Sequence, residues 1–196
     1  KNIEISEFNP IETIDTNVNG TVNVIKMLIK QKPSKFINIS TDKAADASTL
    51  YGNTKQLGER ITSWAGVHIK GTKSGTVRFG NVRETRGNVF EIWNEENRRN
   101  KPLSITDPTM KRYFIHTNEV IDFILNALFI INKGEIFVPK MKKFSVKELA
   151  NEISKKQKII GLRQGEKIQE ILLNNEEKER AIERKDMWVI NPYKKK

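Results

Sequence analysis

The sequence predicts an α/β protein with a mostly parallel sheet, and three observations indicate this class. Segments with helical periodicity alternate with short apolar segments rich in β-branched residues, which favours parallel strands joined by helices. Ionisable residues directly follow the first strand-like segment, where open parallel sheets bind ligands. The 11 glycines form no G-x-G-x-x-G turn. We therefore expect a partial doubly wound, Rossmann-like sheet that lacks its N-terminal strands.

The first predicted helix begins near Asn9 and ends before Pro33. Asn9 is a favourable N-cap, and the missing N–H of Pro10 costs nothing in the first turn of a helix. Apolar residues recur along this segment at spacings of three and four, which predicts one apolar face. They are Ile11, Ile14, Val18, Val22, Ile25 and Ile29.

Strands and helices are expected to alternate along the rest of the chain. Residues 35–40, KFINIS, and residues 75–79, GTVRF, read as strands on either side of a helix that carries Leu57, Ile61 and Trp64. The further expected elements are a helix over 89–97, a strand near 103–106, a helix from Thr117, a strand over 134–140, a helix opening at the capping box 145–148, a strand near 158–162 and a helix through Ile168, Ile171 and Leu172.

The composition favours anionic partners and excludes thiol chemistry. The chain has 35 Lys and Arg against 24 Asp and Glu, a net charge of +11, which favours nucleotides, nucleic acid or an acidic membrane surface. It has no cysteine and only two isolated histidines, so we expect no metal site. No apolar segment approaches the roughly 20 residues that span a bilayer, and no signal-peptide pattern is present, so we expect a cytoplasmic protein.

The segment STDKAADASTLYGNTK, residues 40–55, concentrates the chemistry-bearing side chains. Ser40 to Lys43 would lie at the carboxyl end of the preceding strand. Tyr51 and Lys55 are four residues apart, so both would project from one face of a helix. An ammonium group beside a phenol lowers the phenol pKa from its usual value of ~10. This pattern therefore predicts a tyrosine general base that takes a hydroxyl proton during hydride transfer.

Eight motifs in the sequence together resemble the inverting UDP-N-acetylglucosamine 4,6-dehydratases. These motifs are NVNGTVNVIK, INISTDKAA, LYGNTK, VRFGNV, RGNV, SITDPTMKRYFI, GEIFVPK and GLRQGEK. Members of this family are extended short-chain dehydrogenase/reductases of capsule and flagellin-glycan biosynthesis. The resemblance implies that residues 1–100 are the C-terminal part of an NADP-binding domain with the catalytic residues. Residues 101–196 would mainly form a small C-terminal α/β lobe for the UDP-sugar, with some chain returning to the sheet.

The resemblance also implies a reaction and the residues that perform it. Family members use bound NADP to oxidise the sugar C4 hydroxyl, eliminate water across C5 and C6, and return the hydride to C6 with inversion at C5. Tyr51 would be the C4 base, Lys55 would hold the nicotinamide ribose and tune Tyr51, and Thr41 would hydrogen-bond the C4 oxygen. Asp42 would be the acid for the departing C6 hydroxyl. Lys43 would take the C5 proton, which requires a pKa well below ~10.4.

Binding residues follow from the same resemblance. The cofactor, NADP or alternatively NAD, would contact Ser40, Tyr51, Lys55 and Arg78. The UDP-sugar would contact Asn81, Arg86, Arg112, Arg163 and Glu166. An arginine can hold the diphosphate by a charge-assisted fork, and a glutamate can accept hydrogen bonds from ribose hydroxyls.

Three functional readings stay open at this point. The first is the catalytic and substrate-binding portion of the dehydratase, inactive alone because the glycine-rich cofactor turn is absent, and acting as a homo-oligomer or with a complementing N-terminal chain. On this reading the sequence is a truncated product, a segment or half of a split enzyme. The second is a non-catalytic UDP-sugar-binding or assembly module of a split enzyme. The third, nucleic-acid binding, is disfavoured because the basic clusters are dispersed and lack interleaved aromatic residues.

Overall fold

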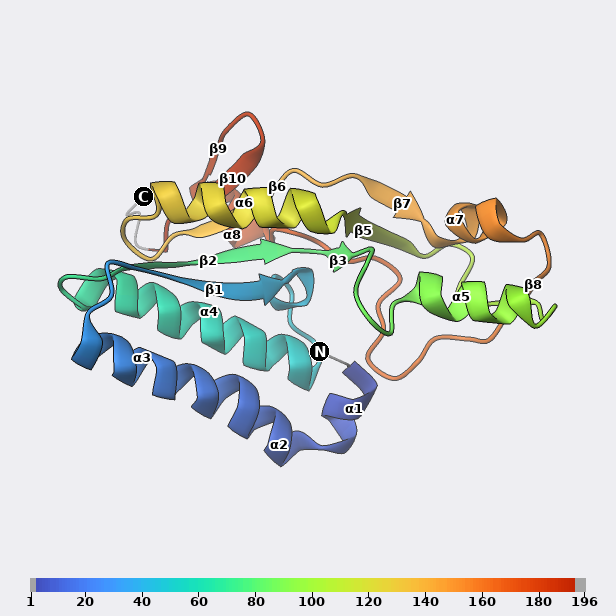
Figure 1. The fold of residues 1–196 in the computed structure, drawn as a ribbon, viewed down its shortest axis with the longest axis horizontal. Coiled ribbons are helices and arrows are strands. Elements are labelled where there is room, and N and C mark those ends of the chain that lie inside the picture. The colour runs from blue at the N-terminus through green and yellow to red at the C-terminus, as the bar shows by residue number, and fades with distance from the viewer. Residues whose placement is uncertain (1–2, 193–196) are drawn as a thin grey trace.

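The structure is a computed structural model that describes residues 3–192. A five-stranded sheet crosses its centre in the order β1-β2-β6-β10-β9 (Figure 1). β1, β2 and β6 run parallel, whereas β10 is antiparallel to both of its neighbours. The predicted α/β class with a parallel sheet is confirmed. The strands are β1 (Lys35–Thr41), β2 (Lys73–Phe79), β6 (Ile136–Pro139), β9 (Ala181–Glu183) and β10 (Met187–Ile190).

Helices cover both faces of this sheet. α4 (Leu50–His68) packs directly on β1 and β2, and α6 (Thr117–Ile130) covers the opposite face (Figure 1). Val77 of β2 and Phe137 of β6 are buried in one apolar cluster with Phe123 and Ala127 of α6. The sheet is therefore buried on both sides, which explains why β6 is entirely apolar and why β2 has only small or apolar residues between Lys73 and Arg78.

The N-terminal residues form a second helical layer outside α4. This layer consists of α1 (Ile3–Phe8), α2 (Pro10–Ile14), a π-helical turn η1 (Asp15–Asn19) and α3 (Gly20–Gln31). Ile25 and Leu28 of α3 pack with Ala65 of α4. Lys32, with a φ of 46°, is the left-handed residue that ends α3. Pro33 follows it directly, so the predicted helix end is confirmed.

Two details of the first predicted helix are wrong. Asn9 does not cap α2 through its side chain, because α1 precedes it and the Asn9 amide donates to the Ile5 carbonyl at 3.0 Å. The predicted apolar face is only partly covered, since Ile11 is 71% and Ile29 is 48% exposed. The reason is geometric: this layer packs on α4 and not on the sheet, so only a narrow stripe around Ile25 is buried.

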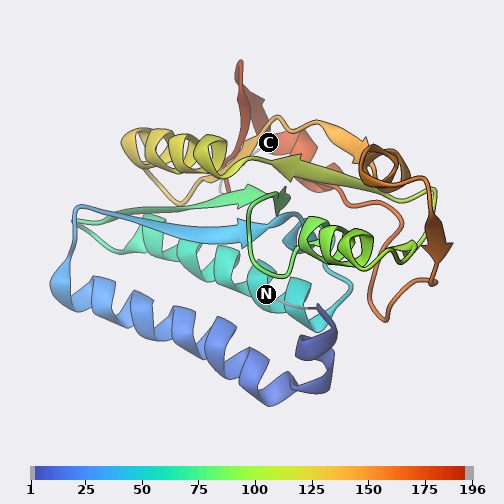
Figure 2. The same cartoon turned by 45° about the vertical axis from the view of Figure 1, so that its right-hand side comes forward.

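The remaining elements form a smaller lobe beyond the carboxyl ends of β1 and β2 (Figures 1 and 2). Its centre is Trp93, which is fully buried and donates from Nε1 to the Ser104 carbonyl at 2.8 Å. Leu103, Ile105 and Leu149 pack around it. The lobe contains β3 (Asn81–Val82), α5 (Val89–Arg98), β4 (Leu103–Ile105), β5 (Lys111–Ile115), β7 (Lys143–Ser145), α7 (Val146–Ile153) and β8 (Gln157–Ile159), with sheets β3-β5-β7 and β4-β8.

The predicted helix through residues 168–172 is wrong. Residues 160–174 are irregular, and the following helix is α8 (Asn175–Arg180), with Asn174 as its N-cap and Glu177 completing a capping box. Leu172 and Leu173 are adjacent in sequence and both buried against β6 and β10. Their burial comes from contact with these two strands, so the apolar spacing in this segment does not report a helical face.

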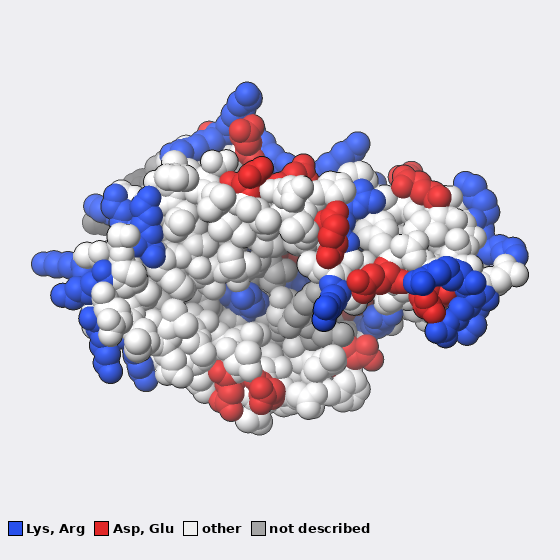
Figure 3. Space-filling view, in the orientation of Figure 1, with Lys and Arg blue, Asp and Glu red and all other residues white. Residues whose placement is uncertain are grey.

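Basic side chains on the face shown in Figure 3 gather in separate groups toward the two ends of the molecule, with acidic groups between them. The centre of that face is largely uncharged (Figure 3). Among residues 3–192 no helix combines the length and apolar character needed to cross a membrane.

Candidate active site

A cleft of about 740 Å³ lies between the end of the main sheet and the smaller lobe. β1 and α4 supply one wall, and the chain after β2 together with residues 160–170 supplies the other. Open parallel sheets bind ligands at this place, outside the carboxyl ends of their strands. From the predicted site, the lining residues are Ser40, Thr41, Lys43, Tyr51, Lys55, Asn81, Arg86, Arg112, Arg163 and Glu166.

The turn after β1, a 3₁₀ segment η2 (Asp42–Ala44), carries the most buried carboxylate of the site. Asp42 is 1% exposed, and its Oδ1 accepts hydrogen bonds from Thr41 Oγ1 at 3.0 Å and Lys43 Nζ at 2.9 Å. Oδ2 of Asp42 and Oγ of Ser40 are buried and make no hydrogen bond with the described residues. Buried polar atoms are nearly always paired, so these two atoms mark places prepared for a ligand or a proton.

Lys43 lies between two carboxylates, and this overturns one expectation. Its Nζ is 2.9 Å from Asp42 Oδ1 and 3.9 Å from Glu170 Oε1. Burial by itself lowers the pKa of Lys43, but Asp42 and Glu170 together outweigh burial, so the pKa lies above its ordinary value. The expectation of a depressed pKa is therefore wrong, because no sequence pattern placed Glu170 beside this amine.

Tyr51 and Lys55 both project from α4 into the cleft, as their spacing predicted. Thr49 caps this helix by accepting from the Gly52 amide at 3.1 Å. Burial raises the pKa of Tyr51, and the Lys43 ammonium opposes that shift without cancelling it. Lys55 donates from Nζ to the Ile39 carbonyl at 2.6 Å, and burial lowers its pKa. The cation that favours the Tyr51 phenolate is thus Lys43, whereas the sequence pointed to Lys55.

Arg78 and Asp42 are the predicted residues that do not line the cleft, and Arg78 lies in a different cluster from the rest of the site. It is 1% exposed on the α4 side of β2 and uses all five of its N–H donors. Four donors form bidentate pairs with Glu59 and Glu177 at 2.6 to 2.9 Å, and the fifth bonds the Leu172 carbonyl at 2.9 Å. No donor is left for a cofactor, so the expected cofactor contact is not supported. Arg78 instead joins α4, β2 and α8.

The five predicted substrate residues line the cleft, but two of them also hold the lobe together. The Asn81 side chain donates to the Tyr113 carbonyl at 3.2 Å. The Arg112 guanidinium donates to the carbonyls of Lys167 and Ile168 at 2.6 and 3.0 Å. Glu166 accepts from the Arg163 amide at 3.0 Å and so closes its own turn.

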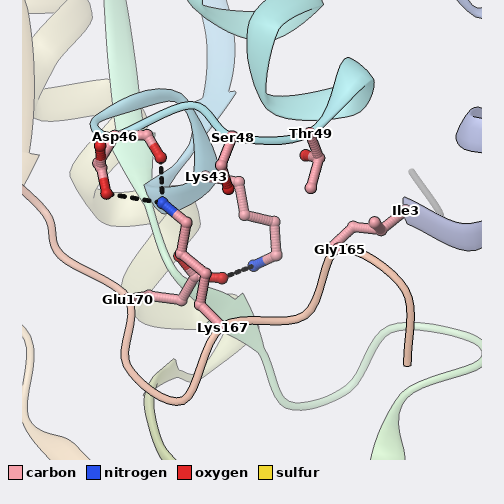
Figure 4. Close-up of a pocket in the computed structure, with 8 residues that line it drawn as sticks. All are labelled: Ile3, Lys43, Asp46, Ser48, Thr49, Gly165, Lys167 and Glu170. Carbon is pink, nitrogen blue, oxygen red and sulfur yellow. Dashed lines mark hydrogen bonds and ion pairs between the residues drawn. The ribbon is translucent and has the colours of Figure 1, made fainter. Parts of the chain in front are cut away.

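Sequence reasoning missed Glu170 and the pair that holds it in place. Figure 4 shows Glu170 and Lys167 on one segment, facing Lys43 of η2 and Asp46 on the loop that follows it. Lys167 Nζ is 2.7 Å from Asp46 Oδ2. The GLRQGEK motif ends at Lys167, and an acidic residue three positions later was the only signal in the sequence. Without a helix there, that spacing carried no geometric meaning.

The residues at the end of β1 fit a nicotinamide ribose. Lys55 and Tyr51 present an ammonium and a phenol at the cleft, which can bond ribose hydroxyls. The unpaired Ser40 Oγ lies at the same strand end and can donate or accept. Among the described residues no group of three or more His, Asp or Glu side chains is arranged to hold a metal ion.

Known proteins resemble this chain over nearly all of its length. It is 34% identical over 197 residues to the inverting UDP-N-acetylglucosamine 4,6-dehydratase of Campylobacter jejuni, a match that covers 98% of this chain and 59% of that protein. It is 35% identical over 198 residues to a UDP-glucose 4-epimerase of Rickettsia rickettsii, covering 97% of this chain and 58% of the epimerase. The chain thus spans about three fifths of the length of these relatives.

Solved structures agree with this fold. The X-ray structure of Pen from Bacillus thuringiensis superposes with a TM-score of 0.92 at 34% identity, covering 97% of this chain and 62% of that one. DesIV, a dTDP-glucose 4,6-dehydratase from Streptomyces venezuelae, was solved with NAD and TYD bound. It superposes with a TM-score of 0.78 at 15% identity, and the match covers 91% of this chain and 63% of DesIV. At this identity the similarity shows only the shared Rossmann-like fold. Residues 1–192 match the profile described as polysaccharide biosynthesis protein, and the chain belongs to this family.

Proposed function

We propose that this chain is the catalytic and substrate-binding portion of a C5-inverting UDP-N-acetylglucosamine 4,6-dehydratase in polysaccharide biosynthesis. The observation that carries the proposal is the ion pair of Lys43 with Asp42 at the end of β1, on the cleft that Tyr51 also lines. A 4-keto sugar loses its C5 proton to a base, and the amine of Lys43 is a base at the wall of that cleft. The 34% identity to the Campylobacter enzyme supports the same reaction.

Binding of the nucleotide-sugar is the first proposed task of the cleft. Arg86, Arg112 and Arg163 line it and supply positive charge for a diphosphate. Glu166 would accept hydrogen bonds from the uridine ribose, and Asn81 would contact the substrate beside β3. NADP, or alternatively NAD, would lie against Ser40, Tyr51 and Lys55. When bound, the nicotinamide supplies a hydride acceptor and later a hydride donor.

The chain's own residues would move the protons. Tyr51 would take the C4 hydroxyl proton as a phenolate, a form that the ammonium of Lys43 favours, and would thereby become the neutral phenol. Thr41 donates to Asp42 at rest, and it would hydrogen-bond the C4 oxygen by turning its hydroxyl hydrogen toward the sugar. The raised pKa of Lys43 keeps its amine charged at rest, so its proton would first pass to the Asp42 carboxyl group, 2.9 Å away. The neutral amine of Lys43 would then take the C5 proton. Asp42 does not line the cleft itself, and its unpaired Oδ2 is the atom that would carry the proton for the departing C6 hydroxyl.

A second candidate is a 4-epimerase, favoured by the 35% identity to the Rickettsia protein. Epimerisation at C4 needs Tyr51 and a hydride carrier but no base for C5 and no acid for C6. The buried Asp42–Lys43 pair would then have no chemical task, which is why we place the dehydratase first. The proposal also includes a cytoplasmic location, and assembly as a homo-oligomer or with a complementing chain.

Turnover tests the proposal directly. The chain is incubated with UDP-N-acetylglucosamine and NADP in deuterated water, alone and with a second polypeptide that carries the part of the Campylobacter relative outside the match. We expect a 4-keto-6-deoxy product with deuterium at C5. Tyr51→Phe and Lys43→Ala should lower its formation at least about 100-fold. Glu183→Gln, on an exposed side chain of β9, is the matched control and should change nothing.

Other results would favour other functions. A product inverted only at C4 would favour the epimerase. UDP binding that survives Tyr51→Phe and Lys43→Ala, with no turnover in any mixture, would favour a non-catalytic binding module. Absence of product from the complemented mixture contradicts the catalytic proposal.

A further inference from the structure

Glu170 is a buried carboxylate that the sequence did not assign to the site. It is 4% exposed, and its Oε1 lies 3.9 Å from Lys43 Nζ. Figure 4 shows its side chain directed at the Lys43 ammonium. Asp42 contacts the same ammonium at 2.9 Å. Lys43 is thus bracketed by carboxylates from two segments that are far apart in the sequence.

The segment that carries Glu170 is held in place by other contacts. Lys167 bonds both the Asp46 carboxylate, at 2.7 Å, and the Asp46 carbonyl. Gly165 has a φ of +80°, and a Cβ there would lie 2.8 Å from the Thr49 side chain, so the chain approaches α4 as closely as only glycine allows. Because these contacts fix the segment, burial of the Glu170 carboxylate is not needed to anchor it.

The charges around the pair explain what Glu170 does. Lys167 on its own segment, Arg112 from β5, and Asp42 and Lys43 from η2 act on the Glu170 carboxyl. Burial is the largest influence and raises the pKa of Glu170, and the three cations reduce that shift. Asp42 and Glu170 raise the pKa of Lys43 while Arg112 lowers it, and Tyr51 from α4 faces the same ammonium. Glu170 is therefore coupled to the ionisation of Lys43.

We propose that Glu170 is a positioning residue for Lys43, which holds the ammonium at the cleft wall and keeps it protonated. The inference deepens the proposed function and rests on it only for the role of Lys43 as the C5 base. In that reaction the neutral amine of Lys43 would form more readily at alkaline pH. Removal of the Glu170 charge would make the neutral amine available at lower pH, because one of its two anionic partners is lost.

The ionisation of Lys43 can be measured without substrate or cofactor. The full chain is treated briefly with acetic anhydride at a series of pH values, and acetylation of Lys43 is quantified by peptide mass spectrometry. Only the neutral amine reacts, so the midpoint reports the pKa. We expect Glu170→Gln to lower the midpoint by about 1 to 3 pH units, the usual effect of an opposite charge at this distance. Glu183→Gln makes the same chemical change at an exposed pair and should leave the midpoint unchanged.

A second variant keeps the test decisive if Glu170→Gln does not fold. Glu170→Asp retains the charge on a shorter side chain, so its acetylation midpoint should lie between those of the wild type and Glu170→Gln. Circular dichroism checks the fold of each variant. A wild-type midpoint in folded Glu170→Gln, or in Glu170→Asp when the glutamine variant is unfolded, overturns the inference. An equal shift in Glu183→Gln also overturns it. Neither result bears on turnover, so failure of this inference and failure of the dehydratase proposal are separate outcomes.

Discussion

Two buried charge clusters lie on the same strand-and-helix framework, and they differ in how fully their polar atoms are paired. In the Arg78 cluster, all five guanidinium donors meet the carboxylates of Glu59 and Glu177 or the Leu172 carbonyl. In the Lys43 cluster, Asp42 Oδ2 is buried without a partner among the described residues, and the pair with Glu170 is 3.9 Å long.

We expect this difference to separate a structural cluster from a candidate functional one. A buried charge that is completely hydrogen-bonded holds segments together and has no capacity left for a ligand. A buried charge that keeps an unpaired atom and pairs with a cleft-lining amine retains capacity to exchange a proton. Burial alone does not distinguish the two clusters, because Arg78 and Asp42 are each 1% exposed.

The largest expected effect is on Arg78. Arg78→Met leaves the carboxylates of Glu59 and Glu177 buried and facing one another, so the free energy of unfolding should fall by about 3 to 5 kcal/mol. Urea unfolding followed by circular dichroism measures it. Lys140→Met breaks an exposed pair with Glu183 and should change stability by less than about 1 kcal/mol. Equal losses in the two variants would refute the structural role of the Arg78 cluster.

A smaller effect is expected from the same substitution in the other cluster. Lys43→Met also leaves two buried carboxylates, but Lys43 is 17% exposed at an open cleft, where water can reach them. The free energy of unfolding should fall by about 1 to 3 kcal/mol, less than for Arg78→Met in the same urea titration. If Lys43→Met costs as much as Arg78→Met, the distinction between the clusters fails.

The smallest effect is expected from the exposed hydrogen-bonded pair of Glu84 and His116. A hydrogen bond from His116, aided by Thr117, lowers the pKa of Glu84 from its ordinary 4.5 to about 2. A carboxyl whose folded pKa is depressed stabilises the fold above its unfolded pKa, and this contribution is lost as the pH falls from about 4.5 to about 2. Glu84→Gln should therefore lose a little stability at neutral pH and match the wild type in acid. A constant difference across that pH range would contradict this assignment.

Much of the fold follows from local patterns. The strands at 35–41 and 73–79, the helix between them and the helix from Thr117 lie where periodicity predicted them. The prediction failed for residues 168–172, where burial of Leu172 and Leu173 comes from β6 and β10 and not from a helical face. It also failed at Asn9, whose side chain bonds a helix that the sequence did not reveal.

The candidate site divides in the same way. All ten predicted residues other than Asp42 and Arg78 line one cleft. They are Ser40, Thr41, Lys43, Tyr51, Lys55, Asn81, Arg86, Arg112, Arg163 and Glu166. Arg78 was wrongly assigned because it lies within a strand, where alternation directs its side chain to the α4 face and away from the strand end. Glu170 was missed because its segment is irregular.

The sequence by itself determined the alternation of β1, α4 and β2, the resemblance to a family, and that Lys43, Tyr51 and Lys55 reach one cleft. These properties depend on neighbouring residues and on motifs, which a linear sequence contains. Only the tertiary structure decided that Lys43 stays protonated, that Lys43 and not Lys55 acts on Tyr51, and that Arg78 is a structural residue. Each depends on distances between segments remote along the chain, and charges interact through those distances and through the water that burial removes.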